Sequence, residues 1–87
     1  MTYDVDWSPL SLNQLARIWT AAPDQNAVTV AADELDRALA RHPLRIGHPL
    51  DSSIHRVAYR HPLGIEYEVV EDDKRVIVQA VFSTISN

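Results

Sequence analysis

The chain contains no cysteine, which excludes both a disulfide framework and a cysteine-ligated zinc site. It has two glycines, far apart in the sequence, so it carries no glycine-rich linker. It also lacks any apolar run near the roughly 20 residues that a membrane-spanning helix needs. The first ten residues show no basic segment followed by an apolar one, which a signal peptide requires. We therefore expect a soluble, cytoplasmic protein without a cofactor.

Positive charge is also scarce. Twelve acidic residues outnumber eight basic ones, which leaves a net charge of −4. Proteins whose main task is to bind a phosphate backbone usually carry a positive surplus, because their cations replace condensed counterions. The balance therefore counts against nucleic acid as the main partner unless a local basic patch exists. A chain of 87 residues is long enough for one domain and too short for two, so we expect a single domain over residues 1–87.

The first half of the chain predicts one strand and two helices. Residues 3–7 alternate apolar and acidic side chains, which is typical of a half-buried strand. Ser8 and Pro9 follow as the N-cap and first position of a helix over residues 9–22, which Pro23 ends. Asp24 then caps a second helix over residues 24–42 with a regular apolar face. Because almost nothing separates the two helices, we expect an antiparallel helical hairpin.

The second half predicts three more strands. A loop over residues 43–53 leads to strands at 54–60, 63–70 and 75–82, joined by short turns that favour antiparallel pairing. The last strand is apolar on both faces, so we expect it inside the sheet. Its two predicted faces are Val76, Val78, Ala80 and Phe82 on one side and Ile77 and Val81 on the other. The expected fold class is α+β, in the order βααβββ, with the helical hairpin on one face of a mostly antiparallel four-stranded sheet.

Five segments carry a resemblance to a known family: residues 5–9 (VDWSP), 15–19 (LARIW), 28–39 (VTVAADELDRAL), 42–47 (HPLRIG) and 62–78 (PLGIEYEVVEDDKRVIV). In this order and spacing the chain resembles the RelE/ParE superfamily of bacterial toxins, often labelled plasmid stabilisation proteins. The resemblance implies a toxin of a type II toxin–antitoxin pair, silenced by a small antitoxin. It also implies one of two activities, cleavage of messenger RNA on the ribosome or inhibition of DNA gyrase.

Two features depart from the ribonuclease branch of this family. RelE-like enzymes usually have an arginine leading into the strand that ends apolar-x-Tyr, and here that position is Gly64. They also tend to end in a basic tail with an aromatic residue or histidine, whereas this chain ends with residues 82–87, FSTISN. These departures argue against ribonuclease activity of the usual kind. Three functions stay open: a toxin that acts by binding, a RelE-type ribonuclease, and a non-toxic interaction module of the same fold.

The candidate site residues are Arg45, Arg56, Arg60 and His61. Because Arg56 and Arg60 share one face of a strand, we expect them to form a basic cluster with Arg45 in the preceding loop. This cluster would contact a phosphate or a partner. Alternatively, the two strand arginines pair across the sheet with carboxylates of the next strand, Glu66 and Glu68. His61 is a candidate for acid–base chemistry because it follows Arg60.

The other polar motifs have plainer interpretations. We interpret His48, His55 and His61 as loop histidines exposed to solvent, and residues 71–73 as a solvated turn. We therefore expect no metal site. Three aromatic residues are expected in the core: Trp7, Trp19 and Tyr67. Several apolar residues are candidates for a groove that binds an antitoxin or a second copy of the chain: Leu10, Leu12, Ile18 and Leu44. The target could equally be the ribosome with its messenger RNA, or DNA gyrase.

Overall fold

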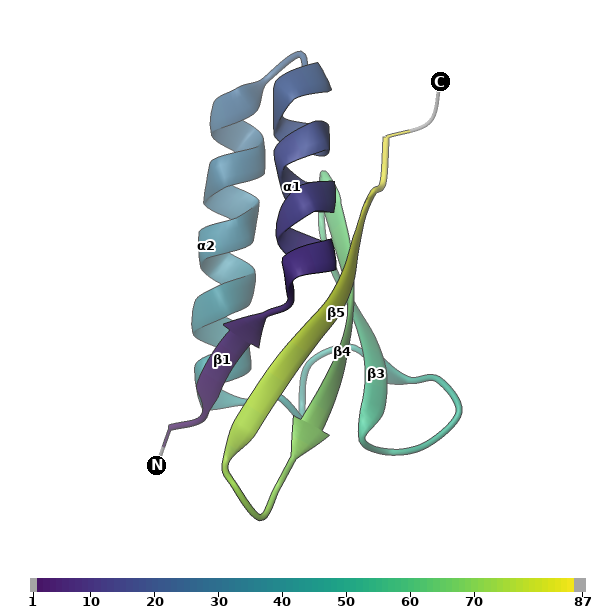
Figure 1. Cartoon of the computed structure of the whole chain (residues 1–87). Helices are drawn as coiled ribbons and strands as arrows, with labels where there is room; N and C mark the ends of the chain where they lie inside the picture. Colours follow the sequence, from purple (N-terminus) through teal and green to yellow (C-terminus); the bar gives the residue numbers. More distant parts are fainter. Residues whose placement is uncertain (1, 86–87) are drawn as a thin grey trace.

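The computed structural model describes residues 2–85 of the chain. Its elements are β1 (Asp4–Trp7), α1 (Pro9–Ala21), α2 (Gln25–Arg41), β2 (His48–Pro49), β3 (His55–Arg60), β4 (Leu63–Val70) and β5 (Arg75–Ser83). The predicted α+β class and the order of the four main strands and two helices are confirmed (Figure 1). The predicted strand count is wrong, because the sheet has five strands. The two-residue strand β2, inside the predicted loop, pairs with β3 and is too short to show periodicity.

Both helices begin where their capping residues predict. The Ser8 side chain accepts a hydrogen bond from the backbone N–H of Ser11 at 3.1 Å, and Pro9 occupies the first turn of α1. The Asp24 side chain accepts the backbone N–H of Ala27 at 3.1 Å and caps α2. Each helix ends two residues before a proline, which fixes the length of the hairpin.

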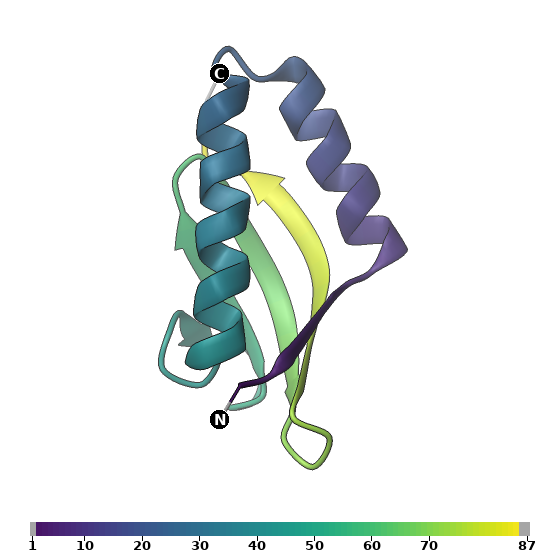
Figure 2. The ribbon, with the colours of Figure 1, turned by 90° about the vertical axis from the view of Figure 1, so that its left-hand side faces the viewer.

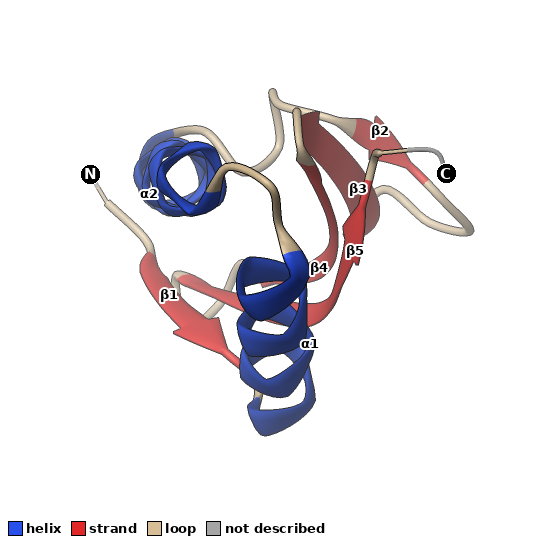
Figure 3. Ribbon diagram, turned by 90° about the horizontal axis from the view of Figure 1, so that it is seen from above, coloured by secondary structure: helices blue, strands red, loops and turns tan. Residues whose placement is uncertain are grey.

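The strands follow the order β1-β5-β4-β3-β2, with β1 parallel to β5 and the other pairs antiparallel. In Figure 2, α2 lies in front of one face of this sheet and α1 lies to its side, next to β5. From above, the strands from β1 to β3 form an arc with α2 on its inner side (Figure 3). The core lies between α2 and the central strands. Its fully buried side chains include Leu35 and Leu39 of α2 and Leu63, Ile65, Tyr67 and Val69 of β4.

Strand β5 lies between β1 and β4, as its apolar character predicts, but its two faces differ from the predicted ones. Glu66 of β4 lies opposite Ala80, whereas Tyr67 lies opposite Val78, so Gln79 is an extra residue in a β-bulge. Beyond the bulge every side chain changes face, since side chains alternate with a period of two. Val81 therefore joins Val76 and Val78 on the helix side, and Ala80 and Phe82 point to the other side with Ile77.

Helix α1 packs less deeply than α2. It lies beside the part of β5 that extends beyond β1, where the Gln14 side chain accepts the backbone N–H of Val81 at 2.8 Å. Of the three aromatic residues expected in the core, Tyr67 is fully buried and Trp7 is half-buried, with its indole N–H donating to Asp36. The prediction is wrong for Trp19, which remains 43% exposed because α1 presents this side of its apolar stripe to solvent.

Candidate functional site

The structure separates the four candidate cationic residues into two groups. Arg45 follows α2 and lies near Arg56 at the start of β3, since Arg56 bonds the neighbouring carbonyls of residues 46 and 47. Arg60 ends β3, and His61 is in the turn after it. Arg60 lies four positions after Arg56 on the strand, which is about 13 Å along the sheet. Arg56 and Arg60 share one face of β3, as predicted. The basic cluster with Arg45 and the roles of these residues in activity remain predictions.

Arg56 is a buried residue, 8% exposed. Its guanidinium donates to three backbone carbonyls of the loop before β3: those of Ser53 at 3.1 Å, Ile46 at 3.2 Å and Gly47 at 3.5 Å. Its Nε is buried without a partner in the described residues. The predicted pairing of Arg56 with Glu66 and Glu68 is wrong, because Arg56 lies opposite Tyr67, whereas the two glutamates project from the other face.

The Tyr67 hydroxyl completes this polar cluster beneath the loop. It donates to the carbonyl oxygens of Pro43 at 2.7 Å and Ile46 at 2.9 Å. Burial raises the pKa of Tyr67, and the adjacent Arg56 acts in the opposite direction. We call Arg56 and Tyr67 the loop clamp, because together they hold the carbonyls of residues 43–53. The sequence gives no direct signal for this arrangement, since it depends on the pairing register of β3 and β4.

The histidines make ordinary polar contacts. His61 is exposed, as expected, and its Nδ1 lies 2.8 Å from the Thr84 hydroxyl. His48 is exposed in β2, whereas His55 is half-buried in β3 and not in a loop. The Nδ1 of His55 lies 2.8 Å from the Asp51 carboxylate, and this hydrogen bond lowers the pKa of Asp51.

Gly64 is buried beneath an aromatic pair. A Cβ built on Gly64 would lie 2.3 Å from the Phe82 ring, well inside van der Waals contact. The Phe82 ring also meets Tyr59 edge-to-face, with ring centroids 5.9 Å apart. An arginine at this position would therefore have to displace Phe82. Of the predicted plain tail, residues 82–85 are described, and Ser86 and Asn87 lie outside the described residues.

A groove runs between α1 and α2, with a volume of about 560 Å³. We call it the helix-pair groove; its apolar lining includes Leu12, Leu15, Ala16, Trp19, Val28 and Ala32. Leu12 is 52% exposed, and the Trp19 indole N–H donates to the Thr29 hydroxyl of α2 at 3.2 Å. Leu12 thus belongs to an open apolar surface, as predicted for a partner groove. Leu10 and Leu44 are exposed but lie outside this groove.

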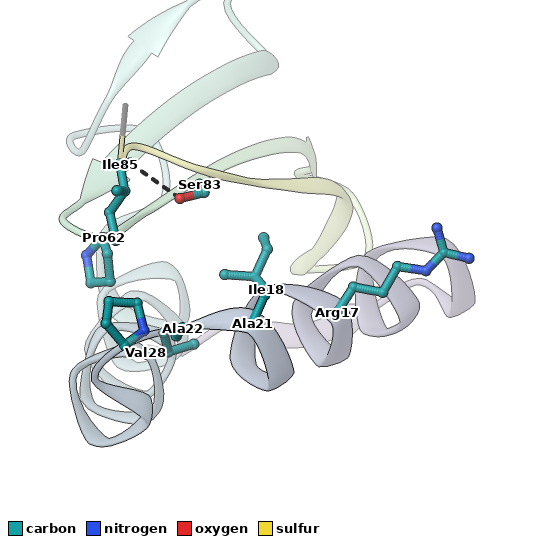
Figure 4. Close-up of a pocket in the computed structure, with 9 residues that line it drawn as sticks. Arg17, Ile18, Ala21, Ala22, Val28, Pro62, Ser83 and Ile85 are labelled. Atoms are coloured by element: carbon teal, nitrogen blue, oxygen red, sulfur yellow. Dashed lines mark hydrogen bonds between the residues drawn. The ribbon is translucent and has the colours of Figure 1, made fainter. Parts of the chain in front are cut away.

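A second hollow, of about 320 Å³, lies on the other side of α1. Ile18 and Val28 line it from the helices, and Pro62 and Ile85 line it from the β3–β4 turn and the segment after β5 (Figure 4). Ile18 is half-buried and packs against the core, so it belongs to this hollow and not to the helix-pair groove.

Among residues 2–85, no group of three or more acidic or histidine side chains could hold a metal ion. The acidic turn is partly neutralised, because Glu71 accepts hydrogen bonds from Lys74 and from the Tyr3 hydroxyl. These contacts lower the pKa of Glu71 and raise that of Lys74. Within the described part of the chain, neither helix has the length and apolar character needed to cross a membrane.

No protein-family model matches the sequence, and no curated protein is similar to it. Solved structures are similar. A chain of the toxin–antitoxin complex RelBE2 from Mycobacterium tuberculosis superimposes with a TM-score of 0.79 at 19% identity, over 95% of this chain and 92% of the other. A chain of the chromosomal ParDE system of P. aeruginosa gives 0.72 at 13% identity, over 95% and 97%. An E. coli RelE mutant in the free state gives 0.71 at 15% identity, over 95% and 84%. The chain has the RelE/ParE fold.

Placement in the RelE/ParE fold clarifies how this chain departs from RelE-type ribonucleases. The resemblance predicts an arginine at position 64, and the structure shows a glycine whose space the Phe82 ring occupies. Arg56, one of the four candidate site residues, donates to loop carbonyls and is largely withdrawn from solvent. The chain therefore has the RelE/ParE fold, and within it Arg56 and Tyr67 hold the loop before β3.

Proposed function

We propose that this protein is the toxin of a bacterial type II toxin–antitoxin module, of the kind associated with plasmid stabilisation. It acts in the cytoplasm by binding a macromolecular target and is neutralised by a small antitoxin. The observation that carries this proposal is the fold, which is shared over 95% of the chain with the toxin–antitoxin complexes RelBE2 and ParDE. The ribosome and DNA gyrase are the two candidate targets.

Binding is favoured over RNA cleavage by the arrangement of the cationic groups. Ribonuclease chemistry needs cations converging on one phosphate and groups that move protons beside it. Here Arg56 and Arg60 are about 13 Å apart along β3, and the Arg56 guanidinium is already occupied by three carbonyls. The net charge of −4 also opposes a phosphate backbone.

The helix-pair groove is the proposed antitoxin site. Full burial of a leucine side chain contributes about 1.5–3 kcal/mol, so Leu12 alone would be a substantial anchor for a partner helix. The outer edge of β1 offers a second contact, because an edge strand can pair with an extended segment. The net charge favours an antitoxin segment with apolar anchors and basic or mixed charge. The alternative occupant of this groove is a second copy of the chain, which would give a homodimer.

Co-expression with the product of the adjacent small gene tests this proposal. We expect a stable complex that survives affinity purification and size-exclusion chromatography. Leu12→Asp should weaken binding at least tenfold, because it places a charge in the groove. Leu10→Asp is the matched control, since Leu10 is 58% exposed on the same helix but does not line the groove. Ile18→Asp is a poorer probe, because Ile18 packs against the core. Absence of a complex, or equal weakening by both variants, would contradict the proposal.

A further inference from the structure

The face of the sheet that points away from both helices carries four carboxylates and a single arginine on its strands. We call it the open face. Its strand residues alternate with the buried ones, so Glu66 and Glu68 of β4 project from it, as do Asp4 and Asp6 of β1. Arg75 is its one arginine or lysine in the strands. Four carboxylates against one guanidinium leave −3 on this face, out of −4 for the whole chain with histidine neutral.

The charges on the open face are unevenly compensated. The Arg75 guanidinium donates to the Asp6 carboxylate, and this contact raises the pKa of Arg75. Glu66 has His55 near it, with Nε2 3.6 Å from the Glu66 carboxylate, and its side chain is still 42% exposed. Glu68 makes no ion pair within the described residues. Glu66 and Glu68 are therefore a pair of accessible carboxylates on the central strand.

An apolar patch lies at one end of the row formed by Glu66 and Glu68. Gly64, Glu66 and Glu68 occupy successive positions on the same face of β4, about 6.5–7 Å apart. Above Gly64 stands the aromatic pair of Phe82 and Tyr59, and Tyr59 is 57% exposed. Along β4, the open face thus presents one apolar position followed by two acidic positions, each two residues from the next.

We propose that the open face binds an extended basic segment of a partner protein. An apolar side chain of that segment packs against Tyr59 and Phe82, and lysine or arginine side chains at the next two alternate positions meet Glu66 and Glu68. The spacing matches, because side chains on one face of an extended chain are also about 6.5–7 Å apart. A second copy of this protein and a nucleic acid are disfavoured, since each would bring negative charge against a face that carries −3. The inference does not depend on the proposed function, and it concerns a different surface from the helix-pair groove.

A synthetic peptide provides the probe. In the basic peptide, serine occupies every second position, and the positions between hold one leucine followed by two arginines. In the acidic control peptide, glutamate replaces both arginines. Fluorescence anisotropy of labelled peptide measures the dissociation constant at low salt, and again near 0.15 M salt, where screening extends over about 8 Å. We expect the basic peptide to bind, the acidic one not to bind, and affinity to fall with added salt. Amide chemical-shift changes should map to β3, β4 and β5.

Variants separate a specific site from general attraction between opposite charges. The double variant Glu66→Gln/Glu68→Gln should weaken binding at least tenfold, and Tyr59→Ser should weaken it severalfold. The matched control is Asp33→Asn/Glu34→Gln, which removes the same charge from the exposed side of α2 and should leave the affinity unchanged. Equal losses in both double variants, shift changes on the helices, absence of binding, or tighter binding of a single-stranded RNA than of the peptide would each overturn the proposal.

Discussion

The loop clamp predicts a large effect from the removal of a single oxygen atom, in Tyr67→Phe. The Tyr67 side chain is fully buried, and its hydroxyl is the donor for the carbonyls of Pro43 and Ile46. Phenylalanine keeps the ring, so packing is preserved. Ile46 retains the Arg56 guanidinium as a donor, whereas Pro43 loses the donor described here. A lost buried hydrogen bond contributes about 0.5–1.5 kcal/mol, and an unpaired buried acceptor costs about 1–3 kcal/mol. We therefore expect a loss of about 1–2 kcal/mol in the free energy of unfolding.

Urea denaturation followed by circular dichroism measures this loss. In thermal denaturation of a domain of this size, 1 kcal/mol corresponds to about 4–8 °C in Tm, so the change is readily resolved by that method as well. The midpoint should fall while the m-value stays constant, because the substitution does not alter the surface exposed on unfolding. Tyr59→Phe is the control, since Tyr59 is 57% exposed and its hydroxyl has no hydrogen-bond partner among the described residues. Equal stability of Tyr67→Phe and wild type would refute the clamp.

Three further predictions concern the same residues and the proposed mechanism. Burial raises the folded-state pKa of Tyr67 above the ordinary tyrosine value of 10.0, so the stability that its neutral form contributes is present below pH 10 and is lost as pH rises above it. Urea titrations at several pH values should show a smaller alkaline loss of stability in Tyr67→Phe, and an unchanged loss would contradict this. Arg56→Ala should cost about 2–4 kcal/mol of unfolding free energy, since it removes the hydrogen bonds to three carbonyls, of which only that of Ile46 keeps the Tyr67 hydroxyl as a donor. Arg60→Ala at the exposed strand end should stay within about 0.5 kcal/mol, and similar values for the two would show that Arg56 is not a structural residue. Primer extension on a translated messenger RNA with ribosomes should reveal no codon-specific cleavage, and cleavage that Arg45→Ala abolishes would instead establish the ribonuclease function.

Local signals predict the elements of this fold well. Ser8, Pro9 and Asp24 define the helix starts through hydrogen bonds that involve neighbouring residues, so the sequence alone is sufficient. The burial of Tyr67 also follows from alternation along its strand. Strand β2 was not predicted because two residues cannot display a period, and the β5 bulge was not predicted because an extra residue in one strand leaves no mark in composition.

The candidate site was harder to predict because it depends on register. Whether Arg56 faces Glu66 or Tyr67 is decided by a one-residue offset between β3 and β4, and that offset comes from the turn at residues 61–62 and the packing of the whole sheet. The exposure of Trp19 likewise depends on how far α1 lies from α2. Residue type identified the polar candidates, whereas tertiary packing decided which of them are accessible.

The measurement that tests the toxin proposal most directly is the count of colony-forming units after induced expression in a bacterial host. The account predicts a loss of viable cells when the chain is expressed alone and recovery when the product of the adjacent gene is expressed with it. Leu12→Asp should keep the toxicity and prevent the recovery, whereas Leu10→Asp should allow it. Unchanged viability with wild-type chain expressed alone, at a level confirmed by immunoblot, would contradict the account and support a non-toxic interaction module.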